Sequence, residues 1–392
     1  MFQRDLAIVY DVAYPFVEGG GQKRMYEVGR RLARRGWKVT WYTLKSWSGP
    51  KTLVIDGISY CGLDGDSNLY TKAGRRSVRE AISFGWAVWR VRGKIARHSR
   101  IWCGQWPYFH IIALLASCRH RMVVDWWETW GHHWLDYGGR LLGYCGYFLE
   151  RSAAMVFSRA GELVTIAVSA RADVIAAGAR QNSVKVIPNG INCAEIENVQ
   201  PTPAGSDVIY AGRLKSHKNV DHLITAVALL RDLHGVRVTA DIIGDGPERS
   251  RLESRTGSLN LQDQVRFHGE LSTPEMLARV KGAGIFVHPS TKEGGGSITL
   301  LEANACGVPV VIYRHRNGID PSLITPGVTG AIVEEVGPEA LAKALVESIC
   351  RENSFIFNRP ACIKFARQYD WDSIASSYDE LLSKVHRESM HR

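Results

Sequence analysis

The sequence predicts an α/β protein made of two doubly wound, Rossmann-like domains. Its 392 residues are too many for one ordinary domain. Short apolar runs alternate with amphipathic stretches, which is typical of a parallel sheet with helices on both faces. The alternation stops at residues 196–207, which hold prolines and few large apolar residues, and then begins again. We therefore assign residues 1–195 to the first domain and residues 196–370 to the second.

The elements of each domain follow from the spacing of apolar residues. Residues 6–10 form a buried strand, and the helix at 22–35 places Met25, Val28 and Leu32 on one side before it ends at Gly36. The further elements expected in the first domain are strands at 38–43, 53–61, 122–125, 163–168 and 184–187, and a helical stretch at 75–98. Those of the second half are strands at 208–211, 236–243, 264–268, 285–288 and 308–313, and helices at 220–233 and 371–385.

Charge is distributed unevenly along the chain. Residues 1–195 hold 27 Lys and Arg against 15 Asp and Glu, a net charge of +12, whereas the remaining residues hold 22 against 24. This asymmetry indicates an anionic partner for the first domain, such as membrane lipid or a phosphorylated acceptor. We expect no nucleic acid partner, because no recognisable binding module is present. Without a spanning apolar run or a signal-peptide pattern, we expect a cytoplasmic protein.

One basic stretch, residues 72–100, contains nine Lys or Arg and a single acid, Glu80. Four large apolar residues fall at helical spacing within it: Val78, Ile82, Trp86 and Trp89. This combination resembles an interfacial helix on an anionic membrane surface, which predicts peripheral association with the inner face of the membrane. The alternative is an ordinary helix whose apolar side packs on the sheet.

Two loops that follow predicted strands suit an anionic ligand. In Glu18-Gly-Gly-Gly-Gln22, Gly20 and Gly21 let the backbone approach a ligand, and the helix that follows offers free N–H groups. Arg213 and Lys218 follow the first strand of the second half, where doubly wound sheets bind ligands, and they suit a diphosphate. The alternatives are a flexible connection in the first loop and two solvated charges in the second.

The segment 289–302 is the most informative one. A glycine-rich loop leads from a strand into an apolar helix, and the N–H groups of Gly295, Ser297 and Ile298 can hold a phosphate. Glu293 in the loop can accept hydrogen bonds from sugar hydroxyls, and Glu302 on the helix can bind a ribose diol. The alternative is an exposed acid on each side of a flexible loop.

We expect no metal site. Asp64-Gly-Asp66 is a D-x-D pattern, and paired acids can hold a metal that is bridged to a diphosphate. A plain turn is favoured here, because the pattern follows a strand and contains glycine. The eight cysteines form no C-x-x-C pair, so we expect free thiols.

Together these segments resemble the family-4 retaining glycosyltransferases of the GT-B fold, the glycosyl transferases group 1. The resemblance covers nearly the whole chain, and its motifs occur in the order of the family. They are the glycines at 19–21, Val186-Ile-Pro-Asn-Gly-Ile191, Ala211-Gly-Arg213 with Lys218, Ile243-Gly-Asp-Gly-Pro247, Phe267-His-Gly269, and Pro289-Ser290 through Glu293 to Leu301-Glu-Ala-Asn-Ala-Cys-Gly-Val-Pro309. The resemblance implies two domains that face each other across a cleft, with the helix in residues 371–392 packing back onto the first.

The resemblance also implies roles for the site residues. Arg213 and Lys218 bind the donor diphosphate, Glu293 faces the transferred sugar, and these three carry catalysis. Glu302 binds the ribose. The donor is a UDP- or GDP-sugar, and neither metal nor another cofactor is needed. The first domain binds a glycan or lipid-linked acceptor, whose hydroxyl receives the sugar with retention of the anomeric configuration.

Two departures from the family pattern bear on specificity. Eight residues separate Glu293 from Glu302, where seven are usual. Trp127, next to Glu128, stands where many relatives place an active-site histidine. We expect Trp127 and Glu128 in the acceptor or sugar pocket, the alternative being that Trp127 only packs beside its neighbours. The rival hypotheses for the whole protein are a catalytically silent GT-B partner subunit and a nucleotide-sugar epimerase.

Overall fold

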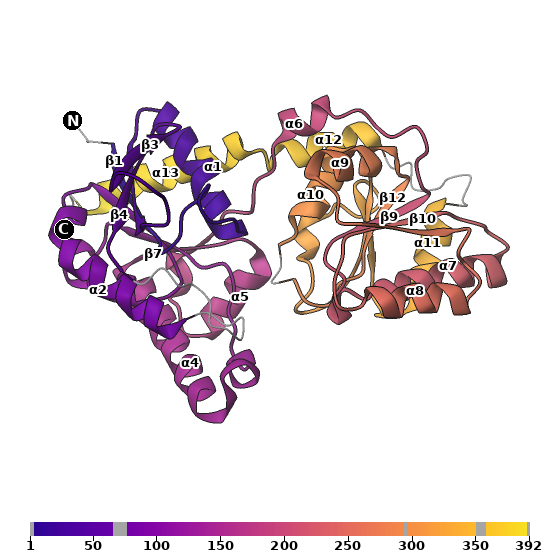
Figure 1. Ribbon diagram of the computed structural model, residues 1–392, viewed down its shortest axis with the longest axis horizontal. Helices are drawn as coiled ribbons and strands as arrows, with labels where there is room; N and C mark the ends of the chain where they lie inside the picture. Colours follow the sequence, from indigo (N-terminus) through magenta and orange to yellow (C-terminus); the bar gives the residue numbers. More distant parts are fainter. Residues whose placement is uncertain (1–3, 66–76, 294–295, 350–357, 390–392) are drawn as a thin grey trace. The chain divides into compact units, whose positions relative to one another are not determined.

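The computed structural model describes residues 4–65, 77–293, 296–349 and 358–389. The chain divides into two compact units (Figure 1). The first consists of Met1–Pro188 and Trp371–Arg392, and the second is Asn189–Asp370. Each unit has its own sheet and its own hydrophobic core, as the sequence predicted.

The second unit begins at Asn189 rather than at residue 196, for a local reason. The N–H of Ile191 donates to Tyr369 O over 2.9 Å, and the N–H of Cys193 donates to Asp370 Oδ2 over 3.1 Å. The short helix α6 (Cys193–Asn198) extends into residues 196–207, where the alternation of the sequence stops.

The first unit is built on an eight-stranded sheet with the order β3-β4-β2-β1-β5-β6-β7-β8. Among the described strands of this sheet, only β3 and β4 pair antiparallel. The prediction of one strand at 53–61 is wrong, because Asp56 and Gly57 both have positive φ, 50° and 81°, and turn the chain into a hairpin. The strands are β1 Asp5–Val9, β2 Lys38–Leu44, β3 Thr52–Ile55, β4 Ile58–Leu63, β5 Arg100–Gly104, β6 Met122–Asp125, β7 Gly161–Thr165 and β8 Val184–Val186.

Helices cover both faces of this sheet. One face packs on α1 and α13, and the other packs on α2, α3, α4 and α5. Their bounds are α1 Gly20–Arg34, α2 Val78–Ile95, α3 Phe109–Cys118, α4 His133–Ala160, α5 Val168–Ala176 and α13 Trp371–Ser389, with a 3-10 turn at Gln181–Ser183. Among the described residues, no helix is long and apolar enough to cross a membrane.

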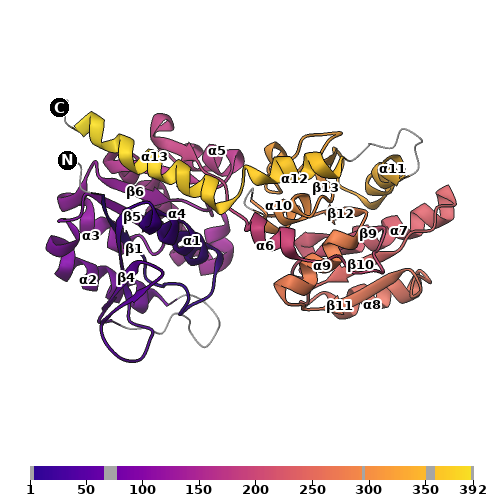
Figure 2. The ribbon, with the colours of Figure 1, turned by 90° about the horizontal axis from the view of Figure 1, so that it is seen from above.

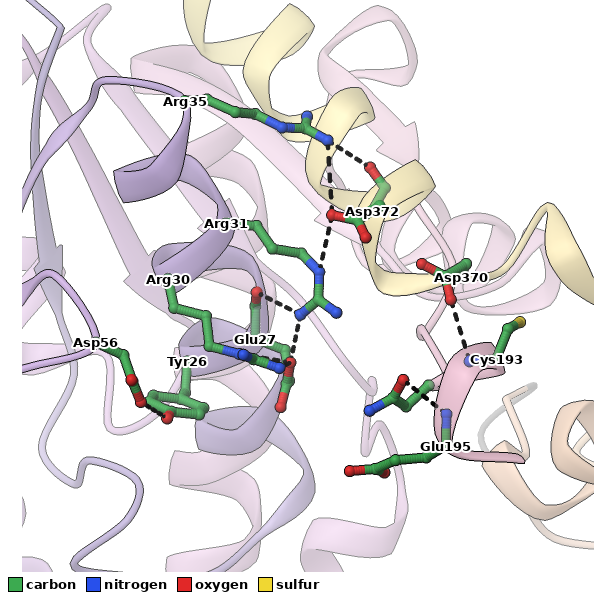
Figure 3. A network of polar contacts seen from close by, with 11 residues as sticks. Tyr26, Glu27, Arg30, Arg31, Arg35, Asp56, Cys193, Glu195, Asp370 and Asp372 are labelled. Carbon is green, nitrogen blue, oxygen red and sulfur yellow. Dashed lines mark hydrogen bonds and ion pairs between the residues drawn. The ribbon is translucent and has the colours of Figure 1, made fainter. Parts of the chain in front are cut away.

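The last helix, α13, packs against α1 (Figure 2). Arg31 Nε lies 3.1 Å from Asp372 Oδ1, and an Arg35 N–H donates to the backbone oxygen of Asp372 over 2.9 Å (Figure 3). Ile374 and Tyr378 on α13 are buried in the core of the first unit. The chain therefore returns to the first unit after it has formed the second.

The second unit contains a six-stranded, fully parallel sheet with the order β11-β10-β9-β12-β13-β14. Its strands are β9 Val208–Ala211, β10 Ala240–Ile243, β11 Val265–Gly269, β12 Ile285–His288, β13 Val310–Tyr313 and β14 Gly330–Val333. One face packs on α7, α8 and α11, and the other on α6, α9, α10 and α12. The further helices are α7 Val220–His234, α8 Arg249–Ser258, α9 Thr273–Gly282, α10 Ile298–Ala305, α11 Pro338–Ile349 and α12 Arg359–Arg367, with 3-10 turns at Ser216–Lys218 and Pro321–Leu323.

Both sheets contain a point at which the strand order reverses. It lies between β1 and β5 in the first unit and between β9 and β12 in the second. Ligands of open α/β sheets bind outside the carboxyl ends of the strands at such a point. The loops that follow these four strands are therefore the places where a site is expected.

Candidate active site

In the second unit, the loop after β9 and the loop after β12 are joined by hydrogen bonds. The N–H of Thr291 donates to His217 O over 3.0 Å, and Asn219 Nδ2 donates to Pro289 O over 2.9 Å. Asn219 has a left-handed backbone (φ 49°), a conformation that asparagine tolerates better than most residues. The N–H of Glu293 donates to Asn317 O over 2.8 Å, which ties in the loop after β13.

This arrangement brings together two of the predicted catalytic residues. Lys218 Nζ forms a hydrogen-bonded ion pair with Glu293 Oε1, and the two side chains are only 15% and 12% exposed. His288, the last residue of β12, is buried and places its Nε2 3.6 Å from the same carboxylate oxygen. The sequence did not single out His288, although it directly precedes the Pro289-Ser290 motif.

The electrostatics of the cluster keep Glu293 ionised. Burial opposes its charge, but Lys218, which both faces and hydrogen-bonds the carboxylate, helps to lower the pKa of the Glu293 carboxyl despite this burial. Burial lowers the pKa of His288 to about 4, so its imidazole is neutral at pH 7. Lys218 is therefore the cation that faces Glu293 at neutral pH. The cluster presents a carboxylate acceptor and an ammonium donor at the strand ends.

Arg213 lies on the same loop as Lys218 but is exposed, and no ion pair of its side chain occurs within the described residues. The glycines of the Ile243-Gly-Asp-Gly-Pro247 motif support its backbone. Gly244 has φ 122°, and a side chain on it or on Gly246 would overlap the carbonyl of Gly212 or Leu214. The N–H of Leu214 donates to Asp245 O over 2.9 Å. This close backbone contact explains why the motif needs glycine at both positions.

Helix α10 begins where the loop after β12 ends. Ser297 is its N-cap residue and Ile298 its first residue, so the free N–H groups of the first turn lie here. Ser297 is buried, and its hydroxyl lies 3.1 Å from that of Thr299. Glu302 is half-buried on the second turn. Gly295 lies outside the described residues, so its predicted contact with phosphate stays a prediction.

In the first unit, Trp127 fills the space that two glycines leave. A Cβ on Gly21 would lie 2.6 Å from the Trp127 ring, and one on Gly104 would lie 2.9 Å from it. Tyr10 contacts the ring edge-on at 5.4 Å between centroids. The glycine loop thus makes room for the indole at Gly21, whereas Gly20 faces open space.

The backbone around Trp127 is held by Gln105, a buried residue that the sequence did not point out. Gln105 Oε1 accepts the N–H groups of Trp127 (2.6 Å) and Glu128 (3.3 Å), and its Nε2 donates to Glu128 O over 2.8 Å. Trp127 Nε1 is buried and has no hydrogen-bond partner among the residues that the structure describes. The Glu128 side chain is exposed and accepts the Trp130 Nε1–H over 2.6 Å.

The structure describes only part of the D-x-D pattern. Asp64 pairs with Lys51 Nζ at 2.6 Å, and this interaction lowers the pKa of the Asp64 carboxyl. Asp66 lies outside the described residues. Within residues 4–65, 77–293, 296–349 and 358–389, no group of three or more His, Cys, Asp or Glu is arranged to hold a metal ion.

Two protein families match this chain. Residues 195–358 match the family Glycosyl transferases group 1, and residues 19–190 match the Glycosyl transferase 4-like domain. The two matches together cover most of the chain, and each falls largely within one unit. The two matches support a group 1 glycosyltransferase of the GT-B fold.

Curated relatives resemble parts of the chain. D-inositol 3-phosphate glycosyltransferase of Mycolicibacterium gilvum is 33% identical over 187 residues, which are 46% of this chain and 39% of the relative. The GDP-mannose-dependent alpha-(1-6)-phosphatidylinositol monomannoside mannosyltransferase of Mycobacterium tuberculosis is 25% identical over 221 residues, 51% of this chain and 56% of the relative. The chain thus spans about half the length of these relatives.

Solved structures share the fold over nearly the whole chain. Sucrose-phosphate synthase from Thermosynechococcus elongatus has a TM-score of 0.75 at 18% identity, and the match covers 98% of this chain and 99% of the other. Anabaena HepE in complex with UDP-glucose has a TM-score of 0.67 at 18% identity, with 97% and 99% covered. The predicted GT-B fold is confirmed.

Proposed function

We propose that the protein transfers a sugar from a nucleoside diphosphate sugar to a hydroxyl group of a glycan or lipid-linked acceptor, with retention of the anomeric configuration. The observation that carries this proposal is the ion pair of Lys218 with Glu293 at the point where the strand order of the second sheet reverses. A nucleotide sugar needs both kinds of group, a cation for its diphosphate and an acceptor for its sugar hydroxyls. The match of residues 195–358 to the group 1 family favours transfer over the silent-partner and epimerase hypotheses.

The donor is proposed to bind to the second unit. Lys218 and Arg213 hold the diphosphate together with the N–H groups of Gly295, Ser297 and Ile298. Glu302 accepts hydrogen bonds from the ribose, and Glu293 from the transferred sugar. Lys218 and Arg213 stabilise the negative charge that develops on the leaving diphosphate, so neither metal nor another cofactor is required.

The ion pair has a consequence for the affinity of the donor. Without donor, Lys218 and Glu293 satisfy each other in a largely buried place, where an unpaired charge is costly. A bound donor replaces both interactions, since diphosphate oxygens take the Lys218 N–H donors and sugar hydroxyls donate to Glu293. A nucleoside diphosphate without its sugar supplies only the first replacement. We therefore expect the intact nucleotide sugar to bind more tightly than its nucleoside diphosphate.

Retention is proposed to follow from attack on the face of the sugar that the diphosphate leaves. The leaving phosphate oxygen then takes the proton of the acceptor hydroxyl, and no protein base is required. His288 does not contradict this step, because it is buried beside Glu293 and neutral at pH 7. The names of two similar proteins support UDP- or GDP-sugars as the donor class, since one is bound to UDP-glucose and the other is GDP-mannose-dependent.

The first unit is proposed to bind the acceptor and to associate with an anionic membrane surface at the inner, cytoplasmic face. On α2 the four apolar side chains named from the sequence are exposed: Val78 by 67%, Ile82 by 55%, Trp86 by 59% and Trp89 by 44%. The Trp86 and Trp89 rings stack at 4.9 Å, and the Arg92 guanidinium lies 4.2 Å from the Trp89 centroid. Indoles and cations that lie side by side are suited to binding in the headgroup layer of an anionic membrane.

The central test is a panel of UDP- and GDP-sugars incubated with the pure protein and with Lys218→Ala, while binding and released nucleotide are measured. The expected result is binding of at least one donor, with nucleotide release that Lys218→Ala reduces strongly and that Lys215→Ala, a change of the neighbouring lysine, does not. If none of the donors binds and none releases nucleotide, the proposal is wrong.

A further inference from the structure

Three tryptophans of the first unit lie together near the carboxyl ends of β5 and β6. Trp106 follows β5, Trp130 follows β6, and Trp134 lies on the first turn of α4. Their ring centroids are 5.0 Å (Trp130–Trp134), 5.2 Å (Trp106–Trp134) and 5.9 Å (Trp106–Trp130) apart. All three residues are only half-buried, so each leaves part of its surface exposed to solvent.

A buried carboxylate fixes the backbone that carries Trp130. Glu150 is fully buried on α4, and it accepts the backbone N–H groups of Trp130 (2.9 Å) and Gly131 (2.7 Å). The Trp134 side chain also interacts with this carboxylate. A side chain on Gly146 would overlap the Trp134 ring, so the glycine lets this indole lie directly on α4. Such supports are typical of a surface that is ordered before its ligand arrives.

A carboxylate borders one of the indoles, and two exposed histidines follow in the chain. The exposed Glu128 carboxylate accepts the Trp130 Nε1–H, and Gln105 holds the Glu128 carbonyl. His132 and His133, which follow Trp130 in the chain, are exposed, and the His132 ring stacks on Tyr147 at 5.2 Å. Ring faces bordered by hydrogen-bonding groups match a pyranose, which has apolar C–H faces and a rim of hydroxyls.

We propose that Trp106, Trp130 and Trp134 form a saccharide-binding platform for the acceptor, with Glu128 as a hydrogen-bond acceptor at its rim. This inference rests on the proposed function and names the class of acceptor that the first unit takes, a sugar-bearing molecule. An alkyl chain on the same rings would bury the Glu128 carboxylate, which costs free energy, whereas a sugar hydroxyl donates to it. The Trp86–Trp89 stack on α2 differs, because a guanidinium rather than a carboxylate lies beside it.

The test measures binding without donor or turnover, so it is independent of transfer. Protein labelled with 5-fluorotryptophan is titrated with methyl glycosides of glucose, galactose, mannose and N-acetylglucosamine, and the 19F resonances are assigned by single Trp→Phe variants. We expect at least one glycoside to shift the resonances of Trp130 and Trp134 and to leave that of Trp86 unchanged. Trp130→Ala is expected to weaken this binding about tenfold, and Trp130→Tyr, which keeps a ring face, less.

Two results would overturn the platform. One is the absence of shifts at Trp130 and Trp134 with every glycoside up to saturating concentration. The other is a shift of these two resonances with phosphatidylglycerol vesicles but with none of the glycosides, which would assign the cluster to lipid. Nucleotide release from a donor, measured in parallel, reports on the proposed function separately, because the donor groups lie on the second unit.

Discussion

Arg24 on α1 and Asp125 at the end of β6 form a buried ion pair, with Arg24 Nε 3.1 Å from Asp125 Oδ2 and both side chains at most 1% exposed. The other Arg24 nitrogens donate to the carbonyls of Ile187 and Pro188 over 2.6 and 2.5 Å. Tyr378 on α13 donates to Asp125 Oδ1 over 2.6 Å. One side chain thus connects the glycine-loop helix with the residues at which the chain leaves the first unit and with the helix by which it returns.

The first prediction concerns the stability of this network. Asp125→Ala leaves the Arg24 charge buried without its partner and should lower the free energy of unfolding by about 3–5 kcal/mol. Tyr378→Phe removes one hydroxyl and should cost about 1 kcal/mol. Urea unfolding followed by tryptophan fluorescence measures both. Asp372→Ala is the control, because it removes a carboxylate that pairs with Arg31 but is 71% exposed. It should change the free energy of unfolding by less than about 1 kcal/mol. A cost of Asp125→Ala no larger than that of Asp372→Ala would contradict this account.

The second prediction concerns the two cations of the donor site. Arg213→Ala and Lys218→Ala should each lower the transfer rate on the order of a hundredfold or more, because both cations stabilise charge on the leaving diphosphate. Arg213→Ala should leave the stability of the second unit unchanged, since its side chain is exposed. Single-turnover kinetics and thermal unfolding measure the two effects. Equal loss of affinity for the nucleoside, which has no diphosphate, would show that these residues are not phosphate ligands.

The third prediction concerns Glu302. If its carboxylate accepts hydrogen bonds from the ribose, Glu302→Gln should weaken the binding of nucleotide sugar and free nucleotide alike, by about 1–3 kcal/mol. Titration calorimetry with UDP and GDP measures this loss. Glu270→Gln, the same change at an exposed residue of the second unit, is the control and should leave the affinity unchanged. Unchanged affinity in a folded Glu302→Gln protein would refute the ribose assignment.

The sequence predicted most strands of the second sheet but not the pairing within its site. Strand runs such as 208–211 and 285–288 are short, apolar and close to glycine, and they are observed at those bounds. Lys218 and Glu293 are 75 residues apart, and their contact exists because β9 and β12 are neighbours in the sheet. Residue type and local spacing do not determine which parallel strands are adjacent, so the ion pair could not be derived from them.

Helix α4 shows a second limit of sequence patterns. Residues 133–160 carry large apolar side chains on the exposed side, among them Leu141 at 80% and Phe148 at 62% exposure. A pattern search that assigns apolar residues to the core therefore finds no clear buried face. The buried acid Glu150 was overlooked for a related reason, since its role depends on the distant N–H groups of Trp130 and Gly131. Surface patches and buried polar contacts both require the tertiary structure.

The fourth prediction concerns the membrane. Binding to vesicles that contain phosphatidylglycerol should be measurable at low salt and should fall steeply as salt rises, because cations of the first unit pair with lipid phosphates. The double variant Trp86→Ala, Trp89→Ala should weaken binding by removing the exposed rings of α2. Leu233→Ala, at a residue 71% exposed on α7 of the second unit, is the control and should have no effect. No vesicle binding at low salt would exclude the interfacial role of α2.

The last prediction concerns Trp127, whose ring lies over Gly21 and Gly104. If the indole also forms a wall of the sugar pocket, Trp127→His should change the ranking of donors without abolishing transfer, because the proposed proton path needs no base here. An equal change in the transfer rate for all donors would mean that Trp127 only packs against its neighbours.

A double-mutant cycle separates this packing from recognition of the sugar. Gly21→Ala alone places a Cβ 2.6 Å from the indole and should disturb the loop, whereas the same change beside the smaller imidazole of the Trp127→His variant should be tolerated better. Additive effects of the two changes would show that the contact between Gly21 and Trp127 does not shape the pocket.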